Sequence, residues 1–381
     1  MDFKLNDEQR LLKDTVKRLV SEKLMPMAAE FGEKNELPRE IIKVLADQGL
    51  LGLYIPEAYG GSSRPGYEAL PICLAREQMA PCLPGEVFFA TQGLGSYPIV
   101  TAGSEEQKNK YLPKAAKGEW VYSFALTEPN AGSDAAAMET RAVLEGDYFV
   151  LNGNKTLISN AGVADVYVVF VKTDPELGVR GISAFIVEKD TPGLKMGKQI
   201  ELLSPHPIGE LIFEDCRVPR ANLLGELGEG FKIAMRTLDV FRQTVGAMAV
   251  GVAQYALDLA VDYARQRNAF GKTLAKYQGI QFKLADMAVE VSAARLLVYY
   301  AAWLKDQGTG GFTKDASIAK LFATEMAQRV VYNAQQIFGG YGMTKEYPIE
   351  ALYRHIRAAA VYEGTSEIQR IIISRQLTGR D

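Results

Sequence analysis

The stretch Asp147-Tyr148-Phe149-Val150-Leu151-Asn152-Gly153 marks the point where the chain changes from helical to strand-like sequence. Aromatic and β-branched residues lead there into Asn152-Gly153, a strong signal for a hairpin turn. Three more strand-like runs follow, at 166–171, 182–187 and 211–213, separated by Gly, Pro and Asp turns. Because no helical segment lies between these runs, they predict an antiparallel β-domain.

The sequence on both sides of this region is helical. Near the start, Asn6-x-x-Gln9 has capping-box spacing and is followed by apolar residues at helical intervals. After Phe231, long segments with apolar stripes are joined by loops as short as 306–312, which predicts antiparallel neighbours in a bundle. The predicted fold class is α+β: an N-terminal all-α domain at 1–118, a central antiparallel β-domain at 119–230 and a C-terminal four-helix bundle at 231–381.

Composition narrows the class of protein. The 381 residues are 48% hydrophobic and 23% charged, which is typical of a soluble globular protein. A net charge of -3 gives no electrostatic reason to expect nucleic acid or an anionic membrane as partner. The polar, acidic start predicts no signal peptide, and the uncharged run Thr244 to Leu257 is shorter than the roughly 20 apolar residues of a membrane span. We therefore expect a cytoplasmic protein.

Cysteine and histidine usage limits the possible chemistry. The 3 cysteines form no CxxC pair and suit a reducing compartment. The 2 histidines, His206 and His355, offer little material for a zinc site or a serine-histidine triad. No metal is predicted.

One glutamate near the C-terminus stands in a turn between two helical segments, in Val361-Tyr362-Glu363-Gly364-Thr365-Ser366-Glu367-Ile368. Thr365 or Ser366 can cap the second helix, and Ser366-x-x-Gln369 has capping-box spacing. A carboxylate fixed on such a turn becomes a stronger base if an apolar cavity receives it, because burial raises its pKa. The alternative is a helix-stop turn with a solvated glutamate.

Four further segments have features of ligand sites, although each also has an ordinary structural reading. Residues 124–134 form a Pro-, Asn- and Gly-containing turn whose backbone N–H groups suit a phosphate or the edge of a flavin. Residues 154–160 present the Ser159 hydroxyl on a strand. Residues 267–272 place Arg267 at a helix end, where a cation can bind a pyrophosphate. Residues 336–342 contain glycines that permit close approach of a ligand, but no βαβ unit surrounds them.

Taken together and in this order, these segments resemble the acyl-CoA dehydrogenase family over Leu5 to Leu377. The resemblance implies the same three-domain layout, FAD as cofactor and an acyl-CoA thioester as substrate, which loses two hydrogens from its α and β carbons. It also implies an electron-transferring flavoprotein as electron acceptor and a homotetramer built as a dimer of dimers.

The resemblance assigns roles to individual residues. Glu363 corresponds to the base that takes the α-proton while the β-hydride passes to flavin N5. In the family the thioester oxygen is held by that glutamate's own backbone N–H and by a flavin ribityl hydroxyl. The FAD-binding residues implied are Phe124, Leu126, Thr127, Ser133, Ser159, Arg267, Phe270, Gln336, Gly339, Gly340, Thr365 and Glu367. The substrate-binding residues implied are Ser133, Asp239, Arg242, Tyr362 and Gly364. The set from Arg267 to Gly340 is expected to bind the FAD of a neighbouring subunit.

Several positions depart from the family pattern. Leu157 stands where many members have a tryptophan against the flavin, and Ala269 replaces a hydroxyl residue. The segment Ser204–Glu210 differs from the usual Arg-, Ser- and Thr-containing sequence, so that His206 is either a contact of flavin or substrate or a structural histidine between two prolines. Phe241 occupies the site of the alternative base of isovaleryl-type members, which supports Glu363 as the base.

The acyl group is predicted from the segment around Phe88, Phe89 and Thr91. Two phenylalanines favour a short, branched or alicyclic acyl group, provided that they face the pocket and not the core. Thr91 is no acidic base of the kind that relatives acting on cyclic enoyl thioesters can carry there, which favours ordinary α,β-desaturation. Two alternatives remain: a flavin oxidase or monooxygenase of the same fold that uses oxygen, and a non-catalytic CoA- or flavin-binding protein.

Overall fold

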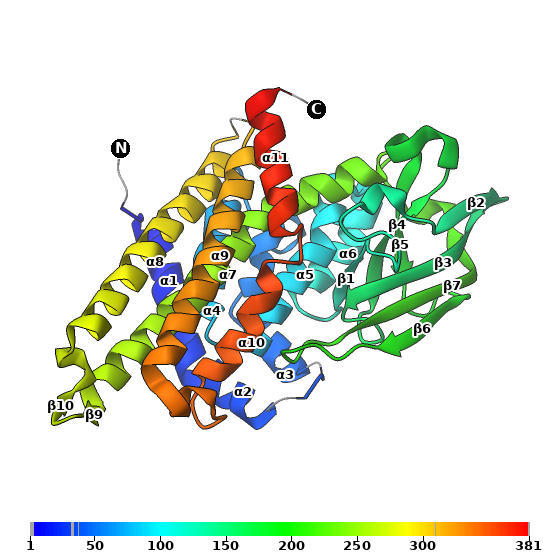
Figure 1. Ribbon diagram of the computed structural model, residues 1–381. Coiled ribbons are helices and arrows are strands. Elements are labelled where there is room, and N and C mark those ends of the chain that lie inside the picture. Colours follow the sequence, from blue (N-terminus) through cyan, green and yellow to red (C-terminus); the bar gives the residue numbers. More distant parts are fainter. Residues whose placement is uncertain (1–3, 32–33, 37, 309, 380–381) are drawn as a thin grey trace. The chain divides into compact units, whose positions relative to one another are not determined.

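A computed structural model describes residues 4–31, 34–36, 38–308 and 310–379 (Figure 1). The chain forms two compact units, one made of Met1–Ala29, Gly66–Glu86 and Asp239–Asp381, the other of Glu30–Pro65 and Val87–Leu238. We call them the bundle unit and the sheet unit.

The bundle unit is helical. Its elements are α1 (Asp7–Leu19), a π-helical turn (Val20–Leu24), α2 (Met25–Phe31), α4 (Ala69–Met79), the start of α5 (Leu83–Ala102), most of α7 (Gly230–Gln266), α8 (Gln278–Asp306), α9 (Thr313–Phe338), α10 (Ile349–Ala359) and α11 (Ser366–Thr378). The long helices α7, α8 and α9 run side by side, and α10 and α11 pack along α9 (Figure 1). A small hairpin of β9 (Asn268–Ala269) and β10 (Lys272–Thr273) connects α7 to α8.

Local signals read from the sequence account for several helix ends. Asn6 and Gln9 form the predicted capping box at the start of α1, with both reciprocal hydrogen bonds present. Thr365 caps α11 by accepting a hydrogen bond from the backbone N–H of Ile368 (3.3 Å). Ser366 is therefore the first helical residue and not the cap.

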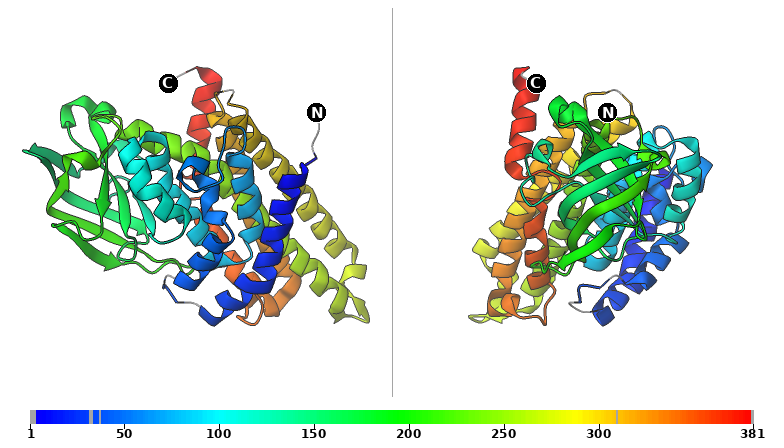
Figure 2. Two further views of the ribbon diagram at one scale, coloured as in Figure 1. Left: turned by 180° about the vertical axis from the view of Figure 1, so that it is seen from behind. Right: turned by 90° about the vertical axis from the view of Figure 1, so that its right-hand side faces the viewer.

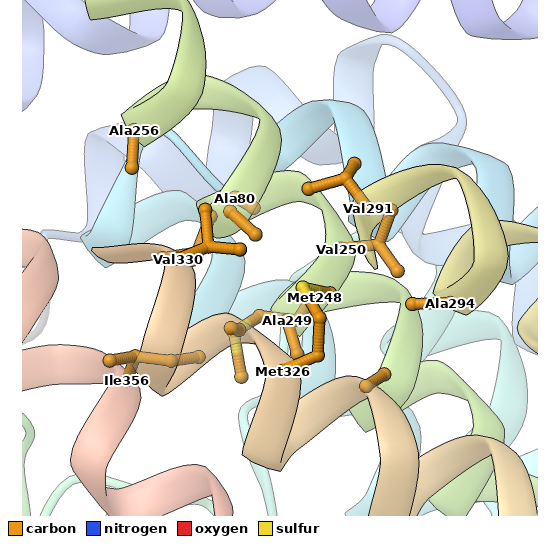
Figure 3. Close-up of a cluster of buried hydrophobic side chains, with 14 of the residues drawn as sticks. Ala80, Met248, Ala249, Val250, Ala256, Val291, Ala294, Met326, Val330 and Ile356 are labelled. Carbon is orange, nitrogen blue, oxygen red and sulfur yellow. The ribbon is translucent and has the colours of Figure 1, made fainter. Parts of the chain in front are cut away.

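The core of the bundle unit is built from small and flexible apolar side chains. Met248, Ala249 and Val250 of α7 contact Val291 and Ala294 of α8 and Met326 and Val330 of α9 (Figure 3). Alanine and glycine along α7 allow neighbouring backbones to approach closely, because these residues add little or no side-chain volume. The tightest approach is at Gly251, where an added Cβ would lie 2.1 Å from the carbonyl oxygen of Glu77 in α4.

The sheet unit combines α3 (Arg39–Asp47), the remainder of α5 and α6 (Glu105–Ala116) with an eight-stranded sheet. The strands are β1 (Tyr122–Ala125), β2 (Arg141–Glu145), β3 (Tyr148–Ser159), β4 (Val166–Lys172), β5 (Ile182–Glu188), β6 (Leu194–Gln199), β7 (Ile208–Pro219) and β8 (Leu223–Leu224). Their order is β6-β7-β3-β2-β4-β5-β8, with β1 paired to β4. Figure 2 shows the twist of this sheet, in which β3 and β7 are long.

The structure confirms the predicted α+β fold class, whereas the domain bounds 1–118, 119–230 and 231–381 stay predictions. It adds two details to the sheet. Most strand pairs are antiparallel, whereas β1 and β2 each pair with β4 in parallel. The predicted hairpin turn at Asn152-Gly153 is wrong: these residues lie inside β3, at a shift in its register with β7. Gly153 (φ 143) packs so closely on Thr140 that no side chain fits there, and Asn152 exchanges hydrogen bonds with Asp215. Asn and Gly thus serve a β-bulge.

Within the described part of the chain, two helices are long and apolar enough to cross a membrane by length and composition alone, α7 and α8. In α7, 72% of the most apolar window is buried within the fold, as in the core helix of a globular protein. In α8 the corresponding share is 33%, and the outward side chains include Phe282, Val289, Leu296 and Trp303. These follow one another at intervals of seven residues and form one apolar face, which we call the α8 face.

The close approach of α7 and α4 makes a stability prediction. Gly251→Ala should lower the apparent free energy of unfolding by about 1–3 kcal/mol, because the new methyl group forces two helices apart. Urea denaturation followed by circular dichroism measures this change. Gly279→Ala in α8 is the matched control, since a Cβ there meets nothing within 4 Å. The control should be neutral or stabilising by up to ~1 kcal/mol, and equal midpoints for the two variants would contradict the close approach.

Candidate active site

The turn that carries Glu363 is held by donors from two helices. The Lys320 ammonium of α9 donates to the carbonyl oxygen of Gly364 (2.6 Å). The Gln369 amide of α11 donates to the same oxygen (3.0 Å) and to that of Glu363 (3.3 Å). Both side chains are fully buried, so these hydrogen bonds form where water competes little.

These hydrogen bonds stabilise an unusual backbone conformation. Glu363 has φ 53 and Gly364 has φ 93, so a non-glycine residue adopts the left-handed region. That conformation costs on the order of 1 kcal/mol or more for such a residue. Among the described residues, Leu157, Asn160 and Phe270 also have positive φ and also lie in segments that the sequence singled out. The fifth such residue, Asp215 (φ 47), lies outside the predicted site segments and pairs with Asn152 at the β3 bulge.

The carboxyl group of Glu363 lies in a buried and positively charged environment. Its Oε2 atom is buried without a hydrogen-bond partner in the described part of the chain, although the residue as a whole is only partly buried. Burial raises the pKa of Glu363, while Arg76, Lys320 and Arg242 oppose the rise and Glu86 adds to it. The alternative of a solvated glutamate is thus excluded for this turn. Such a group is a strengthened base with an oxygen free to meet a ligand.

Two predicted substrate-binding residues lie near Glu363 in the same unit. Arg242 on α7 is buried and forms an ion pair with Asp239, whose other oxygen accepts a hydrogen bond from Thr313 Oγ1 (2.7 Å). Burial lowers the pKa of Arg242, and the charges of Asp239 and Glu363 oppose this. The structure therefore brings Arg242 and Asp239 near the turn that carries Tyr362, Glu363 and Gly364.

A second group of predicted residues lines a cleft in the bundle unit. The cleft has a volume of about 490 Å³ and is lined by Tyr263, Arg267, Ala269, Leu274, Ile337, Phe338, Gly339, Gly340, Tyr341 and Thr344. Added side chains at Gly339 and Gly340 would project into open space, so their backbone is accessible to a ligand. The Arg267 guanidinium lies 5.7 Å from the centre of the Tyr341 ring. A cation, an aromatic ring and accessible backbone suit a phosphate-linked aromatic ligand.

The remaining predicted FAD contacts of the bundle unit lie outside this cleft. The Phe270 side chain is 98% exposed, and Gln336 is exposed on α9. Thr365 and Glu367 begin α11 beside Lys320, which is separated from Gly339 by most of α9. At 1.5 Å per residue, that separation is roughly 28 Å along the helix. One chain therefore carries two distinct sets of predicted FAD contacts in this unit.

The third group lies in the sheet unit, where β1 ends beside β3. The buried Lys155 ammonium binds the carbonyl oxygen of Leu126 (3.0 Å) and the carboxylate of Glu128 (2.7 Å). The Thr156 backbone N–H donates to the Thr127 carbonyl (3.0 Å), and Ser123 Oγ donates to the Ser159 carbonyl (2.6 Å). These bonds bring Leu126, Thr127 and Ser159 together. Phe124 packs on Phe170, and Ser133 is exposed in the turn that follows.

His206 contacts a predicted flavin residue. Its Nε2 atom lies 2.8 Å from Ser159 Oγ, and its backbone N–H donates to Asn35 Oδ1 (2.9 Å). The histidine is thus tied to the hydroxyl that the family resemblance places beside the flavin. Leu157, at the predicted tryptophan position, is half exposed on the β3 bulge.

Sequence reasoning missed the charged residues that surround Glu363. Arg76, Glu86 and Lys320 are almost fully buried, yet none was singled out. A usable signal was present for two of them, because Glu86 precedes the apolar Val87-Phe88 and Lys320 stands alone in Ile318-Ala319-Lys320-Leu321. Arg76 follows the apolar Cys73-Leu74-Ala75 but is followed directly by Glu77. A charge on the apolar face of a helix is a candidate for a buried site.

Comparison with known proteins identifies the class. Family models match three consecutive segments: the acyl-CoA dehydrogenase N-terminal domain at 6–119, the middle domain at 123–216 and the C-terminal domain at 228–378. The short-chain specific acyl-CoA dehydrogenase of Clostridium acetobutylicum is 42% identical over 99% of this chain and 100% of its own length. The chain belongs to the acyl-CoA dehydrogenase family, as the sequence predicted.

Two solved structures extend the comparison. A chain in the structure of the electron transferring flavoprotein of Acidaminococcus fermentans is 44% identical, with a TM-score of 0.95 and coverage of 100% of both chains. The acyl-CoA dehydrogenase of Bacillus anthracis complexed with FAD is 34% identical, with a TM-score of 0.90 over 98% of this chain and 68% of that one.

The opposite electrostatics of two buried glutamates predict opposite effects on stability. The pKa of Glu363 is raised, so its ionisation reduces stability once the pH exceeds the unfolded value of about 4.3. Burial alone would also raise the pKa of Glu86, but Arg76 and His355 outweigh it and hold that pKa at about 2. Ionised Glu86 therefore stabilises the fold above pH ~4.3, and this contribution is lost as the pH falls toward 2.

Glu363→Gln should accordingly raise the apparent melting temperature at pH 7 by roughly 2–4 °C, whereas Glu86→Gln should lower it by a similar or larger amount. The difference between the two variants should shrink as the pH falls from 7 to 4. Differential scanning calorimetry of the ligand-free protein over this range measures both. The same sign of change for both variants at pH 7 would contradict this assignment.

Proposed function

We propose that this protein is an FAD-dependent acyl-CoA dehydrogenase that converts an acyl-CoA thioester to the 2-enoyl-CoA, with Glu363 as the base for the α-proton. The observation that carries the proposal is the Glu363 carboxyl group, whose Oε2 atom is buried without a partner in the described chain, on a strained turn fixed by Lys320 and Gln369. Unsatisfied buried polar atoms of this kind occur where a ligand completes the site.

The environment of Glu363 suits removal of a weakly acidic proton. A base acts best when its pKa approaches the working pH, and burial moves the pKa of Glu363 upward. The three buried cations keep the carboxylate form accessible, because each stabilises its negative charge. The backbone N–H of Glu363 is the expected donor to the thioester oxygen, where negative charge develops as the proton leaves.

The chain also offers groups that fit FAD. The cleft around Arg267 has a cation for the pyrophosphate and open glycine backbone at Gly339 and Gly340. In the sheet unit, the Thr127 and Ser159 segments would hold the flavin ring, with Leu126 beside them. When bound, the flavin supplies the acceptor for the hydride from the β carbon. The relative from Bacillus anthracis, solved with FAD, supports this cofactor.

The assembly and the partner are proposed on separate grounds. The chain keeps Thr365 and Glu367 far along α9 from Arg267 and Gly339, which fits a cofactor bound between two subunits. The α8 face and the exposed Phe270 are apolar surfaces that subunit contacts would cover. We therefore propose a homotetramer in the cytoplasm. The match to a chain of the Acidaminococcus structure supports an electron-transferring flavoprotein as electron acceptor.

The proposed acyl group is short or compact. The Clostridium relative is described as short-chain specific. Phe88 and Phe89 are both buried, and the Phe89 ring lies 4.8 Å from that of Tyr54, so Phe89 packs in the core of the sheet unit. This leaves Phe88 as the phenylalanine available to shorten the pocket. The Thr91 hydroxyl accepts a hydrogen bond from Asn160 Nδ2 (3.1 Å).

Replacement of the base tests the mechanism. Glu363→Gln should retain the yellow cofactor but reduce flavin bleaching by an acyl-CoA at least ~100-fold, the usual contribution of a general base. Stopped-flow absorbance under anaerobic conditions measures the rate. Glu290→Gln, which changes a partly exposed glutamate paired with Arg329, is the control and should bleach normally. Unchanged turnover in Glu363→Gln would remove this residue from the mechanism. Oxygen-dependent formation of hydrogen peroxide or of a hydroxylated product would favour an oxidase or monooxygenase.

A substrate panel tests the acyl group. We expect butyryl-, isobutyryl- and cyclohexanecarbonyl-CoA to bleach the flavin at least ~10-fold more efficiently than lauroyl-CoA, as mismatch of several methylenes with a pocket costs one to a few kcal/mol. The comparison is made as kcat/KM. Phe88→Ala should narrow the difference by admitting longer chains. A preference for lauroyl-CoA in the unaltered protein would overturn the compact-acyl proposal.

A further inference from the structure

A buried ionic network lies next to the Glu363 turn within the bundle unit. The Arg76 side chain of α4 donates from Nε to Glu86 Oε1 of α5 (2.6 Å) and from Nη1 to Thr244 Oγ1 of α7 (2.6 Å). Arg76 and Glu86 are 2% and 1% exposed. Three helices thus meet at one guanidinium group.

Glu86 connects the network to a fourth helix. Its Oε2 atom lies 3.6 Å from Nε2 of His355 in α10. Because its pKa is held at about 2 by Arg76 and His355 against the effect of burial, Glu86 carries a full negative charge at neutral pH. Arg76 and Glu86 therefore form a permanent, oppositely charged pair in the interior.

The same guanidinium reaches the residue before the base. Tyr362, which immediately precedes Glu363, interacts with the Arg76 side chain through its hydroxyl group. Arg76 also contributes the largest opposing charge effect on Glu363, ahead of Lys320 and Arg242, while Glu86 acts in the other direction. Arg76 is therefore linked to the base both through Tyr362 and through charge.

Two further cations, Lys320 and Arg242, also act on Glu363. Lys320 of α9 is tied to the Gly364 carbonyl and also interacts with Glu325 and Glu367. Arg242 of α7 forms an ion pair with Asp239 and also contributes positive charge at Glu363. Arg76 differs from those cations in that it joins the Glu363 turn to Glu86, a carboxylate whose pKa is held at about 2.

We propose that Arg76 is a positioning residue for Glu363 and that Glu86 sets how much of the Arg76 charge the base experiences. This inference rests on the proposed function. Arg76 fixes the Tyr362 side chain and with it the direction of the Glu363 carboxyl group. The negative charge of Glu86 offsets part of the positive charge of Arg76, so that Glu363 remains a strong enough base to take the α-proton. A purely structural role is a weak explanation, because a buried ion pair contributes little net stability compared with apolar residues of similar size.

The test isolates the proton step from the redox step. The probe is an acyl-CoA analogue with sulfur in place of the β carbon, which has an exchangeable α-proton but no β-hydride to lose. Exchange of its α-hydrogen with solvent deuterium, followed by mass spectrometry between pH 5 and 9, reports the base directly. The holoenzyme is compared with Glu86→Gln, Arg76→Lys and the double variant Arg76→Met/Glu86→Gln, which removes the pair without leaving one charge buried alone.

Glu86→Gln and the double variant are expected to shift the pH profile of exchange in opposite directions. Glu86→Gln exposes Glu363 to the whole Arg76 charge, so the acidic limb of the exchange profile should move to lower pH and the maximal rate should fall roughly tenfold. The double variant loses the larger effect of Arg76, so its acidic limb should move to higher pH. Arg76→Lys keeps the positive charge but loses the planar guanidinium group. The acidic limb of its exchange profile should therefore stay at the same pH, while its maximal exchange rate falls.

A matched control uses a neighbouring ion pair, in which the partly buried Arg295 donates from Nε to Oε1 of the buried Glu77 (2.9 Å). Arg295→Met/Glu77→Gln should leave the exchange profile unchanged. If the unaltered protein exchanges the α-hydrogen but the acidic limb of the pH profile is unshifted in all Arg76 and Glu86 variants, this inference is overturned and the proposed function is not. No exchange by the unaltered protein, together with no bleaching by any acyl-CoA, would instead overturn the proposed function. If Glu86→Gln does not fold, the limb position in the double variant decides.

Discussion

The hydrogen bond from Lys320 to the Gly364 carbonyl is the interaction on which the candidate site depends. It crosses from the middle of the bundle to a turn near the end of the chain and holds that turn in a conformation that glutamate rarely adopts. Burial lowers the pKa of Lys320 to about 8, although Glu363 opposes the change. The ammonium group is stabilised in the interior by the Gly364 carbonyl and by the negative charges of Glu363, Glu367 and Glu325.

The arrangement has a thermodynamic logic. A buried carboxylate is unfavourable by itself, and the surrounding cations would make it a weak base if they acted without opposition. Here Arg76, Lys320 and Arg242 lower the pKa of Glu363, while burial and the Glu86 carboxylate raise it. Glu363 is therefore neither held fully neutral nor fully stabilised as the carboxylate. The fold supplies this balance from five helices: α4, α5, α7, α9 and α10. Each contributes one side chain, which explains why no short sequence motif contains the site.

Sequence alone was sufficient for the fold class, the helical regions and the turn of Glu363. These depend on local patterns such as capping residues, apolar periodicity and glycine, which act over a few residues. It failed at Asn152-Gly153, because the pair that favours a tight turn also suits a bulge, and only the packing of Gly153 on Thr140 decides between them. It also missed Arg76 and Glu86, since their function depends on contacts between helices that are distant in sequence. The cofactor contacts came from family resemblance and remain predictions for the individual residues.

The position of the Arg267 cleft has a consequence for handling the protein. Its glycine backbone is open on the surface, and Phe270 beside it projects almost entirely into solvent. If a neighbouring subunit completes this cleft, retention of the cofactor becomes a question of mass action between subunits as well as between protein and ligand. A dilute preparation would then lose its bound flavin, and with it the yellow colour, before it loses secondary structure.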